Sequence, residues 1–368
     1  MTAGAVSRVD TSDPETLVEL VDIVKRFPVR SGRRFGRPSE HVHALAGISL
    51  TVRRGETLGL VGESGCGKST LARCITRLHD VTSGTISFDG QDISTLSRRQ
   101  LRPFRRKMQM VFQDPYGSLN PRRRVGSIIG DPFANNGVAS GEERKRRVQE
   151  LMRLVGLSPE HYNRFPIEFS GGQRQRIGLA RALALNPELV VCDEPVSALD
   201  VSIQAQIINL LAELQRKLGL TYIFIAHDLS VVRHVSDRVA VMYLGKVAEL
   251  GEVEGVYRHA RHPYTSALLS AVPVPDPATA ADRKQIILVG DVPSPVSPPS
   301  GCRFHPRCPK ARDLCVQEDP PLEPRLEDPP THVAACHFPV VDGESLADSQ
   351  PEISASERIV EGGLVGNV

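Results

Sequence analysis

One eight-residue run constrains this chain more than any other feature. Gly62-Glu63-Ser64-Gly65-Cys66-Gly67-Lys68-Ser69 matches the pattern G-x-x-x-x-G-K-[ST] in full. An apolar run at 57–61 precedes it and a helical pattern over 70–78 follows, as a phosphate loop between a strand and a helix requires. Glycines let backbone N–H groups turn toward phosphates, and the helix directs its positive end at the same anions. The run predicts a binding site for a nucleoside triphosphate.

Side chains in and near this loop are expected to have separate roles in binding and hydrolysis. Lys68 supplies a cation for the phosphates, and the Ser69 hydroxyl is suited to bind Mg²⁺. A second apolar run, 189–192, leads into Asp193 and Glu194. We expect Asp193 to hold the Mg²⁺ shell, directly or through a water. We expect Glu194 to orient and polarise the attacking water.

Short apolar runs separated by helical stretches predict a largely parallel α/β core. The expected strands are 17–24, 46–52, 57–61, 189–192 and 222–226. Ser140 and Glu143 predict a capping box, and the following helix has its apolar face at Val148, Leu151, Met152 and Val155.

The chain divides into four parts by composition and pattern. We expect a disordered tail at 1–16, an ATPase domain at 17–270, a C-terminal extension at 271–340 and a disordered tail at 341–368. Within the ATPase domain, about 114–180 is expected to form a helical subdomain, and 31–41 an exposed basic loop.

Charge and hydropathy restrict the partners. The net charge of +2 calls for neither nucleic acid nor an anionic membrane surface. No apolar run approaches the ~20 residues of a membrane-spanning helix, and the first residues lack a signal-peptide pattern. The expectation is a cytoplasmic protein that reaches a membrane by docking on another protein.

The run Ser170-Gly171-Gly172-Gln173-Arg174 resembles the signature motif of the ABC ATPase family, over roughly 17–270 of this chain. The resemblance implies the ABC version of the P-loop NTPase fold, with a helical subdomain and with ATP and Mg²⁺ as cofactors. It also implies an ATP-sandwiched dimer, in which Ser170, Gly171, Gly172 and Gln173 approach the γ-phosphate held by the opposite subunit.

The same resemblance assigns roles to further residues. Gln113 matches the Q-loop glutamine, which approaches Mg²⁺ and the γ-phosphate, Asp200 matches the D-loop and His227 the switch histidine. Phe27 stands where the family places an aromatic that stacks on adenine. The implied catalytic residues are Glu194, His227 and Gln113. The implied nucleotide contacts are Phe27, Gly62, Ser64, Gly65, Cys66, Gly67, Lys68, Ser69, Thr70, Gln113, Ser170, Gly171, Gly172, Gln173, Asp193 and Asp200, with Ser69, Gln113 and Asp193 at Mg²⁺.

Three runs resemble one branch of that family, the oligopeptide and dipeptide importers. These runs are 114–121 after Gln113, His262-Pro263-Tyr264-Thr265, and the extension 301–309. Within this branch, Gly65-Cys66-Gly67 and the run 168–172 resemble the "F" ATPase subunit more than its "D" partner. The resemblance implies two membrane permease subunits, a second, non-identical ATPase subunit and an extracytoplasmic solute-binding protein. It also implies a peripheral place on the cytoplasmic face of the inner membrane.

Four cysteines in the extension, Cys302, Cys308, Cys315 and Cys336, need an explanation of their own. A reducing compartment disfavours disulfides, so we expect a shared metal site. Their spacing lacks the C-x₂-C pairs of structural zinc sites and favours a [4Fe–4S] cluster, with zinc or unmetallated thiols as alternatives. Because the ATPase motifs end before residue 230, a change at Cys308 is expected to spare the nucleotide site.

Other functions of related chains remain as alternatives. The branch includes importers of nickel, glutathione and other solutes, and a non-transport accessory ATPase is a further possibility. A chromosome-maintenance ATPase would place a long coiled coil between Lys68 and Ser170, where this chain has only about a hundred residues and no sustained heptads. A translation-factor ABC protein would carry two sets of motifs, and one is present here.

Overall fold

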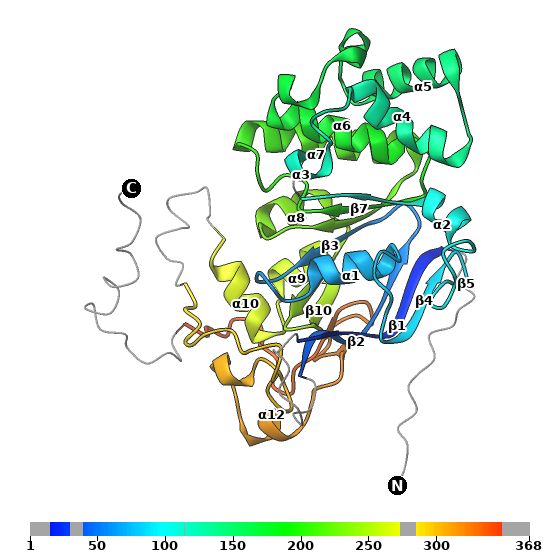
Figure 1. Cartoon of the computed structure of the whole chain (residues 1–368). Helices are drawn as coiled ribbons and strands as arrows, with labels where there is room; N and C mark the ends of the chain where they lie inside the picture. The colour runs from blue at the N-terminus through cyan, green and yellow to red at the C-terminus, as the bar shows by residue number, and fades with distance from the viewer. Residues whose placement is uncertain (1–14, 30–39, 114, 273–284, 348–368) are drawn as a thin grey trace.

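The computed structural model describes residues 15–29, 40–113, 115–272 and 285–347 (Figure 1). An eight-stranded sheet forms its centre, in the order β11-β12-β10-β9-β3-β8-β7-β6. These strands are β3 (Thr57–Val61), β6 (Met108–Val111), β7 (Leu189–Asp193), β8 (Thr221–Ile225), β9 (Arg238–Tyr243), β10 (Lys246–Glu252), β11 (Glu323–Pro324) and β12 (Val333–Ala334). Strands β6, β7, β8, β3 and β9 are parallel, and the others are antiparallel. The predicted parallel core is confirmed.

A second, antiparallel sheet has the order β2-β1-β4-β5. Its strands are β1 (Thr16–Pro28), β2 (His41–Arg53), β4 (Ser83–Phe88) and β5 (Gln91–Asp92). Helix α1 (Lys68–Ile75) packs between the two sheets, where its Leu71, Ala72 and Ile75 join one apolar cluster with both (Figure 1). This packing fixes the start of α1, and with it the phosphate loop, against a rigid base.

The other helices of the ATPase part are α2 (Arg102–Lys107), α3 (Pro115–Ser118), α4 (Val125–Asn136), α5 (Gly141–Leu154), α6 (Gly171–Leu183), α7 (Val201–Leu218), α8 (Leu229–Val235), α9 (Val253–Arg258) and α10 (Pro263–Ser270), with 3₁₀ turns η1 (Pro159–Asn163) and η2 (Pro166–Glu168). Helix α2 lies beside the antiparallel sheet, where Phe104 contacts Phe88 of β4 with 6.3 Å between ring centroids. The others cover the opposite face of the large sheet and the layer beyond it (Figure 1). Helices α4, α5 and α6 contact one another and form the helical layer. Among the described helices, none combines the length and apolarity needed to cross a membrane.

One predicted helix start differs in detail. Helix α5 begins after Ser140 and buries Val148 and Met152, as the pattern predicts. The capping box is wrong, because the Ser140 side chain caps no N–H group. Glu143 pairs instead with Arg147, one turn along the helix, at 2.6 Å. Gly141 has φ 55°, and this turn of the backbone accompanies the loss of the usual cap geometry.

The C-terminal segment from 285 to 347 is attached to the ATPase sheet. It contains η3 (His305–Arg307), α12 (Asp313–Gln317) and the short strands β11 and β12. Strand β12 pairs with β10, so the segment extends the large sheet. The expectation of a distinct cysteine-rich module is not confirmed, because this segment shares the sheet and core of the ATPase part.

A buried polar network reinforces this attachment. Glu249 on β10 is fully buried and accepts hydrogen bonds from the backbone N–H groups of Arg261 (2.8 Å) and His262 (2.9 Å). Its Oε1 also lies 2.7 Å from Nε2 of His332. The Arg261 guanidinium donates two 2.7 Å bonds to Asp328. Buried charges need such partners, so the network ties β10, α10 and the segment into one body.

Several expected regions fall partly outside the described residues. They are most of the tail 1–16, the basic loop 31–41 apart from its last two residues, Asp114, 273–284 of the connector, and 348–368 of the final tail. The described parts 285–300 and 341–347 have no helix or strand.

Candidate nucleotide site

The phosphate loop is held tightly between neighbouring backbone segments. Gly62, Gly65 and Gly67 have φ values of 146°, 80° and 111°, a region that other residues adopt at a cost. A Cβ on Gly62 would lie 2.2 Å from the carbonyl oxygen of Met242 on β9, and one on Gly67 would lie 2.5 Å from the carbonyl oxygen of Ala44 on β2. Only glycine satisfies both demands at these two positions.

Lys68 lies inside the loop and opens α1. Its side chain is buried, and its Nζ donates to the carbonyl oxygens of Gly62 (2.6 Å) and Glu63 (3.0 Å). Ser64 and Gly65 are exposed at the loop tip, Cys66 is buried, and Thr70 lies in the first turn of α1. The ammonium group is thus held next to the space that the loop N–H groups surround.

Asp193 joins the loop to the end of β7. Its Oδ1 accepts a 2.8 Å hydrogen bond from the Ser69 hydroxyl. Burial raises the pKa of Asp193, while the Ser69 hydrogen bond and the charge of Arg73 oppose that rise. A hydroxyl and a carboxylate this close supply hard oxygen ligands of the kind that Mg²⁺ prefers.

Two of the three predicted catalytic side chains, Gln113 and His227, approach one carboxylate oxygen of the third, Glu194. Gln113 donates from Nε2 to Oε2 of Glu194 at 2.7 Å, and Nδ1 of His227 lies 3.6 Å from the same oxygen. Glu194 follows β7 with φ 47°, and its N–H donates to the Ile225 carbonyl of β8 at 3.0 Å. A non-glycine residue in this conformation is strained, and such strain concentrates at functional sites.

The signature residues begin α6 in the helical layer, away from α1 (Figure 1). The Ser170 hydroxyl accepts from the Gln173 backbone N–H, and the side-chain Oε1 of Gln173 accepts from the Ser170 backbone N–H, which forms a capping box. A Cβ on Gly172 would lie 2.4 Å from Ile203 of α7. Asp200 caps α7 by accepting from the Ile203 N–H at 3.0 Å. The signature turn and the D-loop residue therefore lie side by side, at a distance from the phosphate loop.

Phe27 lies near the end of β1 and is half-buried. Its ring meets His79 edge to face, with 5.6 Å between centroids, and the Lys25 ammonium lies 4.8 Å from its centroid. Neither contact tests whether the Phe27 ring stacks on a base, and this role stays a prediction.

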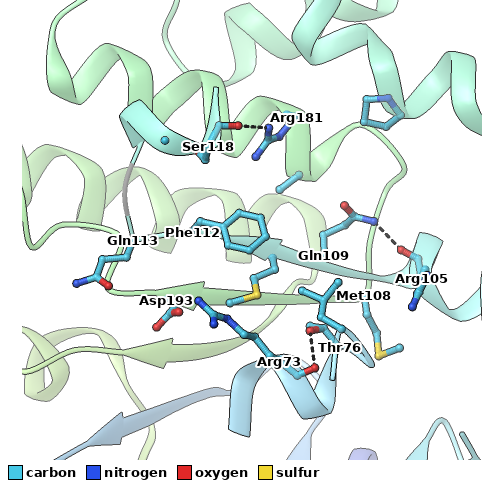
Figure 2. A pocket seen from close by; sticks show the side chains of 15 residues that line it. Arg73, Thr76, Arg105, Met108, Gln109, Phe112, Gln113, Ser118, Arg181 and Asp193 are labelled. Atoms are coloured by element: carbon cyan, nitrogen blue, oxygen red, sulfur yellow. Dashed lines mark hydrogen bonds between the residues drawn. The ribbon is translucent and has the colours of Figure 1, made fainter. Parts of the chain in front are cut away.

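A cavity of about 690 Å³ lies between the helical layer and the ATPase core (Figure 2). Figure 2 shows Gln113 and Asp193 at one end of it and Gln109 and Arg105 at the other. Arg181 of α6 donates to the Ser118 carbonyl of α3 at 2.8 Å, and this bond crosses the upper wall in Figure 2. The cavity is thus continuous with the catalytic group through Gln113.

The four cysteines of the C-terminal segment line one small cavity of about 10 Å³, together with Phe304 and Phe338. Burial raises the pKa of Cys308 to about 12 and that of Cys336 to about 11. The space holds no more than about one water molecule. Within the described ranges, no group of three or more His, Cys, Asp or Glu side chains is arranged to hold a metal ion. The structure does not support the predicted metal site, although it brings the four cysteines together.

Sequence reasoning missed the residues that hold the phosphate loop from behind. Arg307 pairs with Glu63, and the Tyr264 hydroxyl accepts the Glu63 N–H at 2.9 Å. Arg307 and Glu63 are 244 residues apart in the chain. No local motif signals a pair at that separation, although Tyr264 and Arg307 each lie in a run that resembles the importer branch, 262–265 and 301–309.

Comparison with known families gives two matches. Residues 45–197 match the family described as ABC transporter. Residues 248–315 match the family described as the oligopeptide/dipeptide transporter C-terminal region. The second match covers most of β10, all of α9 and α10, and three of the four clustered cysteines.

Curated relatives are similar over most of the chain. The oligopeptide transport ATP-binding protein AppF of Bacillus subtilis is 55% identical over 89% of this chain and 98% of its own length. The oligopeptide transport ATP-binding protein OppF of Escherichia coli is 50% identical, over 85% and 94% respectively. The dipeptide transport ATP-binding protein DppF of Escherichia coli is 47% identical, over 88% and 94%.

A solved structure shares the fold of the ATPase part. It is the dimeric, post-hydrolysis state of the ATP-binding cassette MJ0796 bound to ADP and Pi, which is 31% identical with a TM-score of 0.57. The match covers 64% of this chain and 99% of that one.

Proposed function

Because this chain belongs to the family of ATP-binding subunits of oligopeptide and dipeptide ABC transporters, we propose that it hydrolyses ATP to power the import of short peptides. The observation that carries the proposal is the convergence of Gln113 and His227 on Glu194, directly after Asp193 and its bond to Ser69. The test is purification of the whole membrane complex, followed by assay of peptide-stimulated ATP hydrolysis. A complex that responds to nickel or glutathione and not to peptides would assign another solute.

Different residues of the chain would bind the phosphates, the base, Mg²⁺ and the attacking water. The loop N–H groups, Lys68 and the start of α1 bind the phosphates, and Phe27 packs on the base. Ser69 and Asp193, with Gln113, hold Mg²⁺, which supplies charge neutralisation at the transferring phosphoryl group when bound. Glu194 accepts a proton from the attacking water, and His227 and Gln113 hold that carboxylate in place.

The place of the signature residues supports a dimer of ATPase subunits. Ser170 and its glycines begin α6 apart from the phosphate loop of their own chain, at an exposed helix start (Figure 1). We propose that this turn faces the γ-phosphate on a second, non-identical ATPase subunit, as in a nucleotide-bridged dimer. The complex would further contain two permease subunits and a solute-binding protein. It would lie at the cytoplasmic face of the inner membrane.

The 690 Å³ cavity is the proposed docking groove for a short helix of the permease. Gln113 belongs both to the groove and to the catalytic group, so movement of Gln113 on nucleotide binding would reach the permease. This is a two-state coupling of the kind that γ-phosphate contacts control in other nucleotide switches.

Cross-linking tests the groove. A Gly117→Cys variant, at an exposed position of the cavity wall, is expected to cross-link to a permease chain in the assembled complex. Lys217→Cys, near the exposed end of α7, is the matched control and should give no permease adduct. Adducts of Gly117→Cys with ATPase chains alone would contradict the proposal.

We also propose that the four clustered cysteines share one ligand, a [4Fe–4S] cluster, with zinc as the alternative. Support comes from the four thiols around one cavity, which His262, His305 and His337 also line. Burial raises the pKa of Cys308 and Cys336, so binding a metal as thiolates would release their protons. The segment would have to open around a cluster, because the cavity has only about 10 Å³.

Metal analysis of protein purified without oxygen tests this proposal. We expect about four iron atoms per chain, lost in Cys308→Ser and retained in Cys74→Ala, a buried cysteine outside the group. Zinc in place of iron would overturn the cluster and keep the shared site. A folded segment without metal would overturn both.

A further inference from the structure

The C-terminal segment contacts the phosphate loop directly through an ion pair. Nη1 of Arg307 lies 3.2 Å and 2.9 Å from the two carboxylate oxygens of Glu63, the second residue of the loop. The Arg307 side chain is only 9% exposed and that of Glu63 26%. Pairs this shielded from water keep more of their interaction than surface pairs do.

A second contact holds the backbone of the same residue. The Glu63 N–H donates to the hydroxyl of Tyr264, whose side chain is fully buried. The Tyr264 ring packs against Phe304 (5.4 Å between centroids) and Tyr243 (4.7 Å). Phe304 lies in the same short stretch as Arg307, between Cys302 and Cys308. The conformation of the stretch 302–308 therefore determines where Tyr264 and Arg307 contact the phosphate loop.

A third contact reaches the other end of the loop through the turn between β9 and β10. Arg303 donates to the Leu244 carbonyl, and the next residue, Gly245, donates from its N–H to the Cys66 carbonyl at 2.8 Å. Arg303, Phe304 and Arg307 all lie in the short stretch between Cys302 and Cys308.

We propose that Arg307 and Tyr264 are positioning residues that hold the phosphate loop in its nucleotide-binding shape. ATP affinity then depends on whether the part of the C-terminal segment around the four cysteines is well ordered. The inference rests on the proposed ATP site. A loop fixed before the ligand arrives loses less conformational freedom on binding, and its N–H groups already point at the phosphates. Releasing Glu63 lets the loop take other shapes and lowers the fraction that can bind.

A change at Cys308 is now expected to reach the nucleotide site. Motif positions alone suggest that Cys308→Ser would spare the nucleotide site. The contacts of Arg303, Phe304 and Arg307 indicate the opposite, because loosening the segment would loosen the loop.

The test measures the Kd for MgATP in the full complex. We expect Arg307→Met and Tyr264→Phe each to raise the Kd about threefold to tenfold, the range for losing one shielded polar contact. The kcat at saturating ATP should change less than twofold, because neither side chain touches the reacting atoms. Arg238→Met is the matched control, since Arg238 forms an equally shielded ion pair with Glu56 at the start of β9, away from the phosphate loop and the C-terminal segment.

A double-mutant cycle separates positioning from general loss of structure. In a Glu63→Gln background, Arg307→Met should cause little further loss of affinity; an equal loss in both backgrounds would overturn the proposal. An unchanged Kd in Arg307→Met and Tyr264→Phe, with a parent that binds MgATP, would overturn it as well. A parent that fails to bind MgATP would overturn the nucleotide site itself.

Discussion

Glu194→Gln is expected to lower the rate of ATP hydrolysis by about 10²-fold or more, the size of a typical general-base contribution. The substitution keeps the size of the side chain and leaves an oxygen to accept the hydrogen bond of Gln113. It removes the negative charge that draws a proton from water. Binding of MgATP should persist, because Lys68, Ser69 and Asp193 are unchanged.

The measurement is steady-state phosphate release, with nucleotide affinity measured alongside. The ATP-bound dimer should then accumulate and appear as the larger species on size-exclusion chromatography. Glu188→Gln is the matched control at the other end of β7, where Glu188 pairs with Arg54 and Lys107. Turnover by Glu194→Gln at close to the parental rate would refute the assignment of Glu194.

Lys68→Ala is expected to weaken MgATP binding by about 10-fold to 100-fold. Charge-assisted hydrogen bonds contribute about 1.5–3 kcal/mol, and the buried Lys68 ammonium is hydrogen-bonded to the loop backbone itself. Its removal also takes one donor from the carbonyls of Gly62 and Glu63, of which the Glu63 carbonyl keeps the Cys66 N–H at 3.2 Å, and this loosens the loop before nucleotide arrives.

Nucleotide titration of the purified complex measures this effect. Lys68→Met separates its two causes, because methionine fills most of the buried space without the charge. Similar losses in both variants would assign the effect to the charge. An affinity equal to that of the parent in both would contradict the role given to Lys68.

The nucleotide chemistry was predictable because its parts are local in the sequence. The phosphate loop needs glycines and a lysine at fixed spacing between a strand and a helix, and the structure has β3, the loop and α1 in that order. Asp193 and Glu194 follow a run buried on all its positions, which is typical of a central parallel strand. Because neighbouring parallel strands end at one edge of a sheet, Gln113 and His227 could be expected near Glu194. Their roles, however, came from resemblance and not from spacing.

What the sequence by itself determined was therefore the α/β core, the phosphate loop and the acids at the end of β7, because short-range pattern decides each of them. The tertiary structure alone decided how the C-terminal segment is used. Its cysteines suggested a separate, metal-ordered module, whereas β12 pairs with β10 and Arg307 reaches Glu63. Contacts between residues so far apart depend on how the whole chain packs, and a single sequence carries no periodicity that would reveal them.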